Sequence, residues 1–553
     1  MLYWPPVAGA QLWIVRLRLT HMKTKNNGWA SSFVAGMSAL FAFVGNNAPA
    51  GGVPVAPCIT PPYTILTNYY VSKTGNDSNN GSTNFPWLTI QHAVNALGAG
   101  AHGGVCVNVG NGTYTEAVVG YGVSGSAASP AGYLIFRSKN LHGATVQMPA
   151  ASATGYNCCF QFNNSSYVIV DGFNLVGQLV TNSLEKGFGA NRTSSASSPS
   201  HHFKVLNNII HDHGGAGIGF TYTDYIDLEG NVIYNCAEYS IYNESGITDW
   251  VPVACDQNSG FHNIIADNIS FSNKVVYIGN LAHTDGEGII MDSFRDAGGR
   301  YGPYEYPSLI ENNLVFGNGG GGIEIYNSDY VTVRNNTAYQ NFLDTLNTAT
   351  WRGDIGAFWA SNNVFINNIS VADTAVNTYN KAYTDASSDG SNVGNVWKNN
   401  LSFNGTAGQP STLIVNSTST ITAANGNILG SAPLFNSPAK DDFTLQAASP
   451  AINTGTTNYD IPAIDLAGSI PANGFVNMGA YEFTPVPTLE ITSIGSGVII
   501  SWPSALNGFS LESTTNLSNP NWVPVTNQIF VIDRSFVFTN TAAGSSQFFR
   551  LTE

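Results

Sequence analysis

Short runs of alternating apolar and polar residues recur along most of the chain, and asparagines mark where these runs begin. Val331–Asn335 is one such run, because apolar side chains occupy every second position. This alternation predicts strands with one buried face, and no helical period runs through the same part of the chain. An asparagine followed by an apolar residue and then by alternation occurs at Asn208, Asn231, Asn268, Asn313, Asn336, Asn368 and Asn400.

The spacing of these asparagines predicts a solenoid. Two of the intervals, 208 to 231 and 313 to 336, are 23 residues long, and two others, 336 to 368 and 368 to 400, are 32 residues long. A period of roughly 20 to 50 residues is typical of stacked repeats. Several short strands per unit predict the turns of a β-helix, with rungs about 4.8 Å apart. We expect the asparagines to form a hydrogen-bonded ladder and to adopt the left-handed backbone of a sharp corner.

This pattern resembles the right-handed parallel β-helix of the pectate-lyase-like superfamily, from about Tyr69 to Phe483. The resemblance implies an all-β, single-stranded solenoid. It leaves the activity open, because that superfamily holds lyases, hydrolases, epimerases and non-catalytic adhesins.

We expect five parts along the chain. They are an extra N-terminus with a signal peptide (1–50), a linker (51–68), the β-helix (69–484), a second linker (485–488) and a small β-sandwich (489–553). Within the first part, Lys23 and Lys25 precede the apolar run Phe33–Val44 and the small residues Ala48-Pro-Ala50. This order is typical of a signal peptide starting at Met22, and the run is too short for a membrane span. We therefore expect a secreted or cell-surface protein.

The two ends of the β-helix carry their own signals. Ile90, Ala93, Val94 and Leu97 lie on one face of a predicted helix, which we expect to cap the first coil. Ser449–Phe483 resembles the closing phrase of secreted bacterial β-helix proteins and predicts a C-terminal cap. The evenly spaced strands of 489–553 resemble a fibronectin-III-like module.

Composition narrows the function classes. The formal charge is −15 and no basic patch is present, which argues against nucleic acid as a partner. An acidic surface also repels polyanions unless a cation intervenes. The six cysteines are Cys58, Cys106, Cys158, Cys159, Cys236 and Cys255. None forms a C-x-x-C pair, which argues against zinc, and Cys236 with Cys255 is the natural disulfide if the thiols are not free and buried. We interpret His201, His202, His211, His213 and His262 as surface or corner residues.

Overlaying the repeat units predicts a functional face. We match Gly288–Ser293 to Gly322–Asn327, and the latter to Ile355–Ala360. The inward residues are then Ile289, Met291, Ile323, Ile325 and Phe358, and the outward residues are Ile290, Asp292, Glu324, Tyr326, Ala357 and Trp359. Insertions at Glu244–Ser259 and Phe294–Pro307 predict binding walls beside this face. The candidate substrate-binding residues are His283, Glu324, Tyr326, Trp359, Arg300 and Tyr301.

The densest polar run, His283–Asp292, contains Asp285, Glu287 and Asp292. Like charges raise one another's pKa, so three carboxylates this close need compensation. A hard cation such as Ca²⁺ would supply it by binding all three. Alternatively, one carboxyl group stays protonated and serves as a general acid. Asp-Gly is also common in turns, which leaves a corner role open for Asp285.

The calcium alternative predicts a lyase that removes a proton from a uronate polymer. Its catalytic candidates are Asp285 and Asp292, with Lys274, Arg295 or Arg300 as the base. Family-nine pectate lyases have an Asp-Gly followed shortly by a catalytic lysine; this chain has Asp285-Gly286 but no lysine in the following strand.

The protonated alternative predicts a glycoside hydrolase. His283-Thr-Asp-Gly286 resembles the Asn-Thr-Asp-Gly of polygalacturonases, and Gly320–Gly322 falls where those enzymes have Gly-His-Gly. Their histidine and their Arg-x-Lys are missing here. The resemblance implies an inverting enzyme in which Asp285 pairs with Asp292 or Glu324.

Together these observations predict an exported, monomeric, polysaccharide-active enzyme. A calcium-assisted lyase on an acidic glycan ranks ahead of the hydrolase. A non-catalytic glycan binder is the third possibility.

Overall fold

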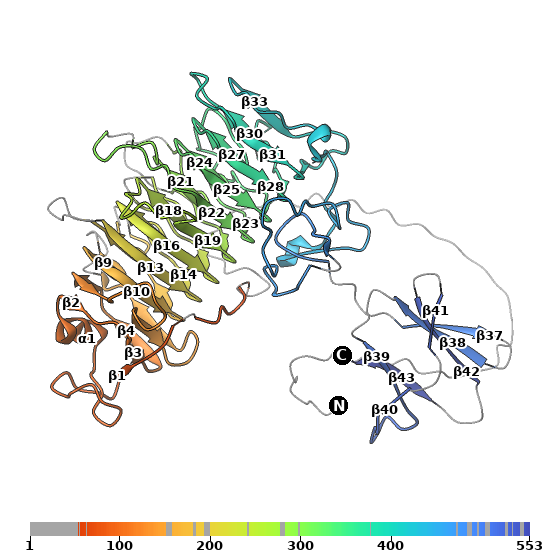
Figure 1. Cartoon of the computed structure of the whole chain (residues 1–553), viewed down its shortest axis with the longest axis horizontal. Coiled ribbons are helices and arrows are strands. Elements are labelled where there is room, and N and C mark those ends of the chain that lie inside the picture. The colour runs from red at the N-terminus through yellow and green to blue at the C-terminus, as the bar shows by residue number, and fades with distance from the viewer. Residues whose placement is uncertain are drawn as a thin grey trace. The chain divides into compact units, whose positions relative to one another are not determined.

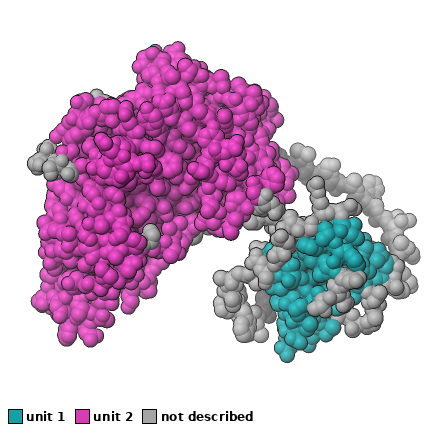
Figure 2. All heavy atoms as spheres, viewed as in Figure 1, with its two compact units in different colours: residues 1–46, 484–553 teal, residues 47–483 magenta. Residues whose placement is uncertain are grey.

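The computed structural model divides the chain into two compact units, residues 47–483 and residues 1–46 with 484–553 (Figure 2). It describes residues 54, 56–61, 63–150, 157–180, 184–192, 199–240, 243–276, 283–296, 299–376, 378–471, 474–483, 489–494, 497–503, 509–525, 529–532, 535–541 and 547–552. The predicted signal peptide and the linker at 485–488 lie outside the described residues. Among the described helices, none is long and apolar enough to cross a membrane.

Three long parallel sheets build the larger unit (Figure 1). Sheet 1 contains β1 (Thr67–Val71), β3 (Val105–Val109), β7 (Leu134–Ser138), β10 (Ser166–Asp171), β13 (Ser200–Leu206), β16 (Thr223–Glu229), β19 (Asn263–Ala266), β22 (Ser308–Glu311), β25 (Val331–Arg334), β28 (Val364–Ile366) and β31 (Val396–Lys398). Sheet 2 contains β4 (Gly112–Thr115), β8 (Ala144–Gln147), β11 (Asn174–Val176), β14 (Ile209–His211), β17 (Val232–Tyr234), β20 (Ile269–Phe271), β23 (Leu314–Phe316), β26 (Thr337–Tyr339), β29 (Ile369–Val371), β32 (Leu401–Phe403) and β34 (Ile428–Leu429).

Sheet 3 completes each coil and carries the candidate site. It contains β5 (Val118–Tyr121), β9 (Cys158–Asn163), β12 (Lys186–Asn191), β15 (Ile218–Thr221), β18 (Ile247–Trp250), β21 (Ile289–Asp292), β24 (Ile323–Tyr326), β27 (Ile355–Phe358), β30 (Tyr383–Ala386) and β33 (Thr412–Val415). From β7 to β33 the chain visits sheets 1, 2 and 3 in turn, and neighbouring strands within each sheet pair in parallel between successive coils. The predicted right-handed parallel β-helix is confirmed.

The interior of the coil explains the alternation in the sequence. Inward side chains from all three sheets form one apolar cluster that runs the length of the solenoid, and most of its members are fully buried. Phe160, Phe188 and Phe203 belong to it. Each strand therefore needs apolar residues only at every second position, because the other face of the strand points away from the interior.

The predicted asparagine ladder is present at the corner between sheets 1 and 2. Each side-chain amide donates to the side-chain oxygen of the next asparagine, at 3.0 to 3.2 Å along the whole series. The series runs through Asn208, Asn231, Asn268, Asn313, Asn336, Asn368, Asn400 and Asn427. The expected left-handed backbone falls one residue earlier, at positions such as Asn207, Asn312 and Asn335. The ladder residue itself keeps a negative φ, and its side chain points into the stack.

A second ladder, between sheets 2 and 3, ends on a carboxyl group. Asn273, Asn318 and Asn341 bond in series, and Asn341 donates its amide to Asp354 Oδ2 at 3.3 Å. Asp354 is fully buried, its Oδ1 has no partner among the described atoms, and burial raises its pKa to about 8. Asp354 therefore occupies the place of an asparagine in the ladder but carries an ionisable group there.

We expect Asp354→Asn to stabilise the protein increasingly as the pH rises. The folded-state pKa is raised, so the contribution of Asp354 to stability is complete below its unfolded value near 3.8 and is lost as the pH rises through about 8. The stability gain of the variant over the parent should therefore grow by up to about 1.4 kcal/mol per pH unit in that window. Urea unfolding at several pH values measures this gain, with Asp460→Asn at an exposed position as the control. A gain independent of pH would contradict the prediction.

The N-terminal end of the β-helix is covered. The predicted helical cap is α1 (Ile90–Leu97), which follows the N-cap Thr89 and buries Ile90, Ala93 and Val94 in the interior cluster. The short parallel pair β2 (Gly100–Ala101) and β6 (Val123–Ser124) connects the residues that follow α1 with those that follow β5.

The segment predicted as the C-terminal cap has a different position from the one expected. Residues of 435–480, including Phe443 and Met478, pack in one apolar cluster with Ile269, Phe271 and Leu314. They therefore cover the outer face of sheet 2, which is apolar and would otherwise meet water. The stretch just before the predicted cap contains the antiparallel pair β35 (Phe435–Ser437) and β36 (Asp442–Leu445) and the short helix η3 (Pro438–Lys440). Another short helix, η2 (Ala423–Asn425), precedes β34.

The described part of the smaller unit is a β-sandwich, as predicted. One sheet contains β37 (Glu490–Ile494), β38 (Gly497–Pro503), β42 (Ser535–Thr541) and β41 (Phe530–Ile532), and the other contains β40 (Val523–Pro524), β39 (Ser510–Thr514) and β43 (Phe548–Thr552). All strand pairs are antiparallel, and Ile500, Trp502 and Phe549 form part of the shared core. The closer likeness to a fibronectin-III module stays a prediction.

The predicted disulfide is absent, because all six cysteines are free thiols. Cys236 is fully buried in the interior of the coil, where its thiol donates to the carbonyl of Tyr234 at 3.3 Å. Cys255 lies beyond β18, in the insertion that leads to β19. The alternative interpretation, free thiols, holds for this pair.

Candidate active site

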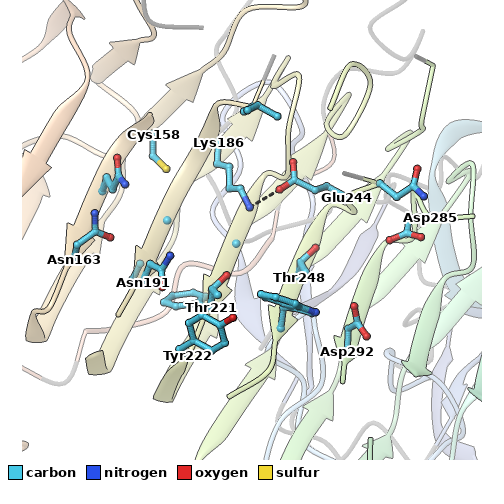
Figure 3. A pocket seen from close by; sticks show the side chains of 18 residues that line it. Cys158, Asn163, Lys186, Asn191, Thr221, Tyr222, Glu244, Thr248, Asp285 and Asp292 are labelled. Carbon is cyan, nitrogen blue, oxygen red and sulfur yellow. Dashed lines mark ion pairs between the residues drawn. The ribbon is translucent and has the colours of Figure 1, made fainter. Parts of the chain in front are cut away.

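A cavity of about 560 Å³ opens on the outer face of sheet 3 (Figure 3). Five consecutive strands, β9, β12, β15, β18 and β21, supply most of its walls. Its lining includes Cys158, Gln161, Asn163, Lys186, Asn191, Thr221, Tyr222, Asn243, Glu244, Thr248, Trp250, Asp285 and Asp292. A volume of this size suits a few sugar rings, and the mixture of polar and aromatic groups is typical of a ligand site.

The strand register determines which side chains share this face. Thr221, Trp250, Asp292 and Tyr326 occupy equivalent positions in β15, β18, β21 and β24. The row two residues earlier holds Gly219, Thr248, Ile290 and Glu324. The predicted outward positions of Asp292, Glu324 and Tyr326 are therefore correct.

The predicted register of β27 is wrong by one residue. Tyr326 pairs with Phe358, and Ile323 pairs with Ile355, so Phe358 faces outward and Ala357 faces inward. A shift of one residue exchanges the two faces of a strand. Phe358 is nevertheless buried, because its ring folds back over Gly356 on the same face, and that position has no room for a side chain.

Four carboxyl groups gather at the β21 end of the cavity and beside it. Burial raises the pKa of Asp292 to about 7, with the charge of Asp285 adding to the effect. Burial likewise raises the pKa of Asp285 to about 6, with Glu244 contributing, although the hydroxyl of Thr284 donates to it at 2.7 Å and opposes the shift. The predicted proximity of these two groups is therefore present.

Glu287 and Glu324 complete the group. Burial first, and then the charge of Asp285, raise the pKa of both well above the usual range. The hydroxyl of Ser245 donates to Glu287 Oε2 at 2.5 Å, which ties the segment before β18 to the segment before β21. Their burial therefore favours the neutral form of both glutamic acids.

Among the described residues, no Lys, Arg or His forms an ion pair with any of these four carboxyl groups. Their charges are compensated by protons or by a bound cation. Carboxylate oxygens are ligands that Ca²⁺ accepts. Within the described part of the chain, however, Asp285, Glu287 and Asp292 do not bring three ligand oxygens within 4.8 Å of one another, so the calcium site stays a prediction.

The cationic group in the cavity is already paired. Lys186 Nζ lies 2.5 Å from Glu244 Oε1 (Figure 3). Burial opposes the charge of Lys186, but Glu244 raises its pKa above the usual value. Lys186 is therefore a permanent cation and a hydrogen-bond donor rather than a base. The sequence interpretation missed this lysine because it lies about 100 residues before the acidic run.

Aromatic side chains form a wall beside the carboxyl groups. The ring of Tyr222 lies 5.5 Å from that of Trp250 and 5.0 Å from that of Tyr301. The guanidinium of Arg300 lies 5.0 Å from the ring of Tyr301 and 5.8 Å from that of Tyr222. The wall therefore contains two residues that the sequence analysis predicted, Arg300 and Tyr301. It also contains two that the sequence analysis missed, Tyr222 and Trp250. Trp250 could have been found from its repeat position, which equals that of Asp292.

The other predicted aromatic residues form a separate group farther along sheet 3. The ring of Trp359 lies 5.6 Å from that of Tyr326 and 5.0 Å from that of Trp351. Trp359 follows the end of β27 and has a φ of 49°. This group borders the carboxyl cluster through Tyr326, whose pKa is raised by burial and by Asp292.

Lys274, Arg295 and His283 interact with partners other than the four carboxyl groups. Lys274 is exposed, packs over Gly319 and acts electrostatically on Glu238. Arg295 donates two hydrogen bonds to Asp329, at 2.7 and 2.8 Å. His283 Nδ1 lies 2.7 Å from Asp344 Oδ2. None of these three side chains forms an ion pair with Asp285 or Asp292 in the described part of the chain, although the backbone of Lys274 packs beside Gly286.

No family model matches the chain, and no curated protein matches it. Among solved structures, the chain is similar to pectate lyase Pel9A, with 15% identity over 76% of this chain and 98% of that one, at a TM-score of 0.42. It is also similar to XylC in complex with xylose (12% identity, 82% and 92% covered, TM-score 0.43) and to the GH136 lacto-N-biosidase from Eubacterium ramulus (12% identity, 66% and 67% covered, TM-score 0.39). At these values the likeness is one of fold alone.

The fold and the cavity together define the class. The chain is a parallel β-helix protein with an acidic, aromatic-walled cavity on one sheet face.

Proposed function

We propose that the protein is a glycoside hydrolase, with Asp285 and Asp292 as its two catalytic carboxyl groups. The observation that carries the proposal is the arrangement of these two groups in one cavity, with pKa values raised to about 6 and about 7 and an aromatic wall beside them. Two carboxyl groups whose environments separate their pKa values are suited to acid and base roles.

The roles follow from the two pKa values. Asp292, with the higher value, holds a proton near pH 7 and donates it to the glycosidic oxygen as that bond breaks. Asp285 is ionised first and either activates a water molecule or attacks the anomeric carbon. Trp250 and Tyr222 offer ring faces against which a sugar can pack. Lys186 and Asn191 offer hydrogen-bond donors to sugar hydroxyls.

We infer that the substrate is an uncharged glycan. The cavity gathers carboxyl groups, its one lysine is neutralised by Glu244, and the whole chain carries a charge of −15. A uronate polymer would meet repulsion here unless calcium bound first. The preferred sequence interpretation, a calcium-assisted lyase, needs a base beside the carboxyl groups. Among the described residues, none of the candidates Lys274, Arg295 and Arg300 forms an ion pair with Asp285 or Asp292, and Arg295 is bound to Asp329.

A panel of glycans separates the alternatives. We expect uncharged oligosaccharides or polysaccharides to yield new reducing ends without ultraviolet absorbance and without loss of rate on adding a chelator. Unsaturated, ultraviolet-absorbing products from a uronate polymer, abolished by the chelator, would instead establish the calcium-dependent lyase. Retained glycan affinity with neither product would establish the binding protein.

The activity should follow a bell-shaped pH profile with its maximum between about 6 and 7. Activity rises as the pH passes about 6, because Asp285 must lose its proton, and falls above about 7, because Asp292 must keep its own. The profile of kcat/KM measures both limbs for the pair as a unit. Asp292→Glu should move the alkaline limb, and an unchanged limb in that variant would remove Asp292 from the acid role.

We also propose that the protein is exported and monomeric. N-terminal sequencing of the mature protein, expected to start after Ala50, checks the first statement. Sedimentation equilibrium of the mature protein checks the second.

A further inference from the structure

A second cluster of reactive side chains lies where the chain enters sheet 1, away from the carboxyl groups. His201 and His202 begin β13, and Cys255 lies in the insertion between β18 and β19. The Nδ1 atoms of the two histidines are 2.8 Å apart, and one ligand atom from each of the three residues lies within 4.8 Å of the others. All three residues are half-buried.

We propose that His201, His202 and Cys255 bind a zinc ion. Two imidazole nitrogens and one thiolate sulfur form a borderline donor set, which suits Zn²⁺ and does not suit Ca²⁺ or Mg²⁺. With bonds of about 2.0 Å to nitrogen and 2.3 Å to sulfur, tetrahedral ligand atoms lie roughly 3.3 to 3.6 Å apart. The two Nδ1 atoms, now 2.8 Å apart, would separate by a few tenths of an ångström, and all three ligand atoms already lie within 4.8 Å of one another. Water would supply the fourth ligand.

The backbone explains why two consecutive histidines can face one site. His202 has a φ of 58°, and it falls between the paired positions Ser166↔His201 and Val168↔Phe203. Tyr167 and Tyr225 occupy the equivalent unpaired position in the two neighbouring coils, and both also have a positive φ. Because His202 has a left-handed backbone, its side chain points to the same face of the strand as that of His201. In a regular strand the two would point to opposite faces.

Surrounding rings hold the imidazoles in place. His202 stacks on Tyr225 with ring centroids 4.2 Å apart, and Tyr225 stacks on His262 at 4.0 Å. Tyr167 contacts both histidines from the other side, at 5.0 Å from His201 and 4.7 Å from His202. Because the rings are fixed by their neighbours, little rotational entropy is lost when a metal binds.

A buried carboxyl group anchors the cysteine. The backbone N–H of Cys255 donates to Asp224 Oδ2 at 2.7 Å. The hydroxyl of Tyr304 donates to Asp224 Oδ1 at 2.6 Å, and His262 Nδ1 lies 3.0 Å from the same oxygen. Asp224 and His262 are both fully buried. This network holds the insertion against the coil at the place where its thiol meets the histidines.

Zinc takes a cysteine ligand as the thiolate. Zinc binding would form a Zn–S bond and release the thiol proton to solvent, so the site should bind more tightly as the pH rises. The proposal is independent of the hydrolase function.

Cobalt provides the direct test, because Co²⁺ takes the place of zinc and reports its ligands by colour. The full chain, treated with chelator and dialysed, is titrated with Co²⁺ and then with Zn²⁺. We expect one Co²⁺ per chain, an intense near-ultraviolet band from thiolate coordination, and loss of that band on adding one equivalent of Zn²⁺. Cys255→Ser should abolish the band, and Cys58→Ser, which removes an exposed thiol elsewhere, should leave it unchanged.

Three results would overturn the proposal: no thiolate band in the parent protein, an equal band in Cys255→Ser, or loss of the band in Cys58→Ser. Zinc X-ray absorption of the loaded parent protein needs no variant and so does not depend on folding. We expect two nitrogen ligands and one sulfur ligand from the protein. A first shell of oxygen alone would also overturn the proposal.

Discussion

Asp292→Asn should lower kcat by about 10²- to 10⁴-fold on the best glycan found, while the protein stays folded. The amide keeps the size of the carboxyl group but cannot donate a proton to the leaving oxygen. Burial raises the pKa of Asp292 to about 7, so removing its ionisable group costs the folded state nothing at neutral pH. Asp285→Asn should reduce turnover by at least as much, because it removes the group that acts on water or on the anomeric carbon.

Glu305→Gln is the matched control. Glu305 is exposed in the insertion between β21 and β22 and does not line the cavity. Its substitution by glutamine removes one negative charge, as Asp292→Asn does. Its kcat and KM should equal those of the parent. Near-normal turnover in both Asp285→Asn and Asp292→Asn would remove the proposed site, whereas loss of activity with a lowered melting temperature would show a role in folding instead.

Asn313→Ala should lower the free energy of unfolding by at least about 4 kcal/mol. The Asn313 amide donates to the carbonyls of Ile265 and Glu311 at 2.8 and 2.9 Å and to Asn336 Oδ1 at 3.0 Å. Its oxygen accepts the backbone N–H of Asn268 at 3.0 Å. Alanine would leave several buried groups without partners, and each such group costs about 1 to 3 kcal/mol.

Chemical unfolding followed by tryptophan fluorescence measures this loss. Asn458→Ala, at an exposed position outside the ladder, should stay within about 0.5 kcal/mol of the parent. If Asn313→Ala were equally mild, the ladder would be a consequence of the coil rather than a cause of its stability. We expect the opposite, because every rung shares its hydrogen bonds with the rungs on both sides.

The acidic part of the site was predictable because it is local in the sequence. Asp285, Glu287 and Asp292 fall within one unit, and alignment of that unit with the next places Glu324 on the same face. The prediction failed where one residue of register mattered, at Ala357 and Phe358. The side-chain period of a strand is two, so a match wrong by one residue reverses every orientation in it.

The rest of the site was not predictable, because it depends on how the coils stack. Cys158, Lys186 and Trp250 reach the cavity from β9, β12 and β18, which belong to three different coils. Neighbouring rungs are separated by 23 residues in some coils and by 45 in others, because insertions of different length leave the coil. The sequence pattern does not show at which residue each insertion leaves the coil and at which residue it rejoins the coil.

The repeat of asparagines and the apolar alternation are sufficient to determine a β-helix, because buried corners need amide ladders and the coil interior excludes polar side chains. Only the stacked structure decided which residues meet. It paired Lys186 with Glu244, and it brought His201 and His202 to a cysteine more than 50 positions away. Strand alternation is a property of neighbours along the chain, whereas a site on a solenoid is a property of neighbours between its coils.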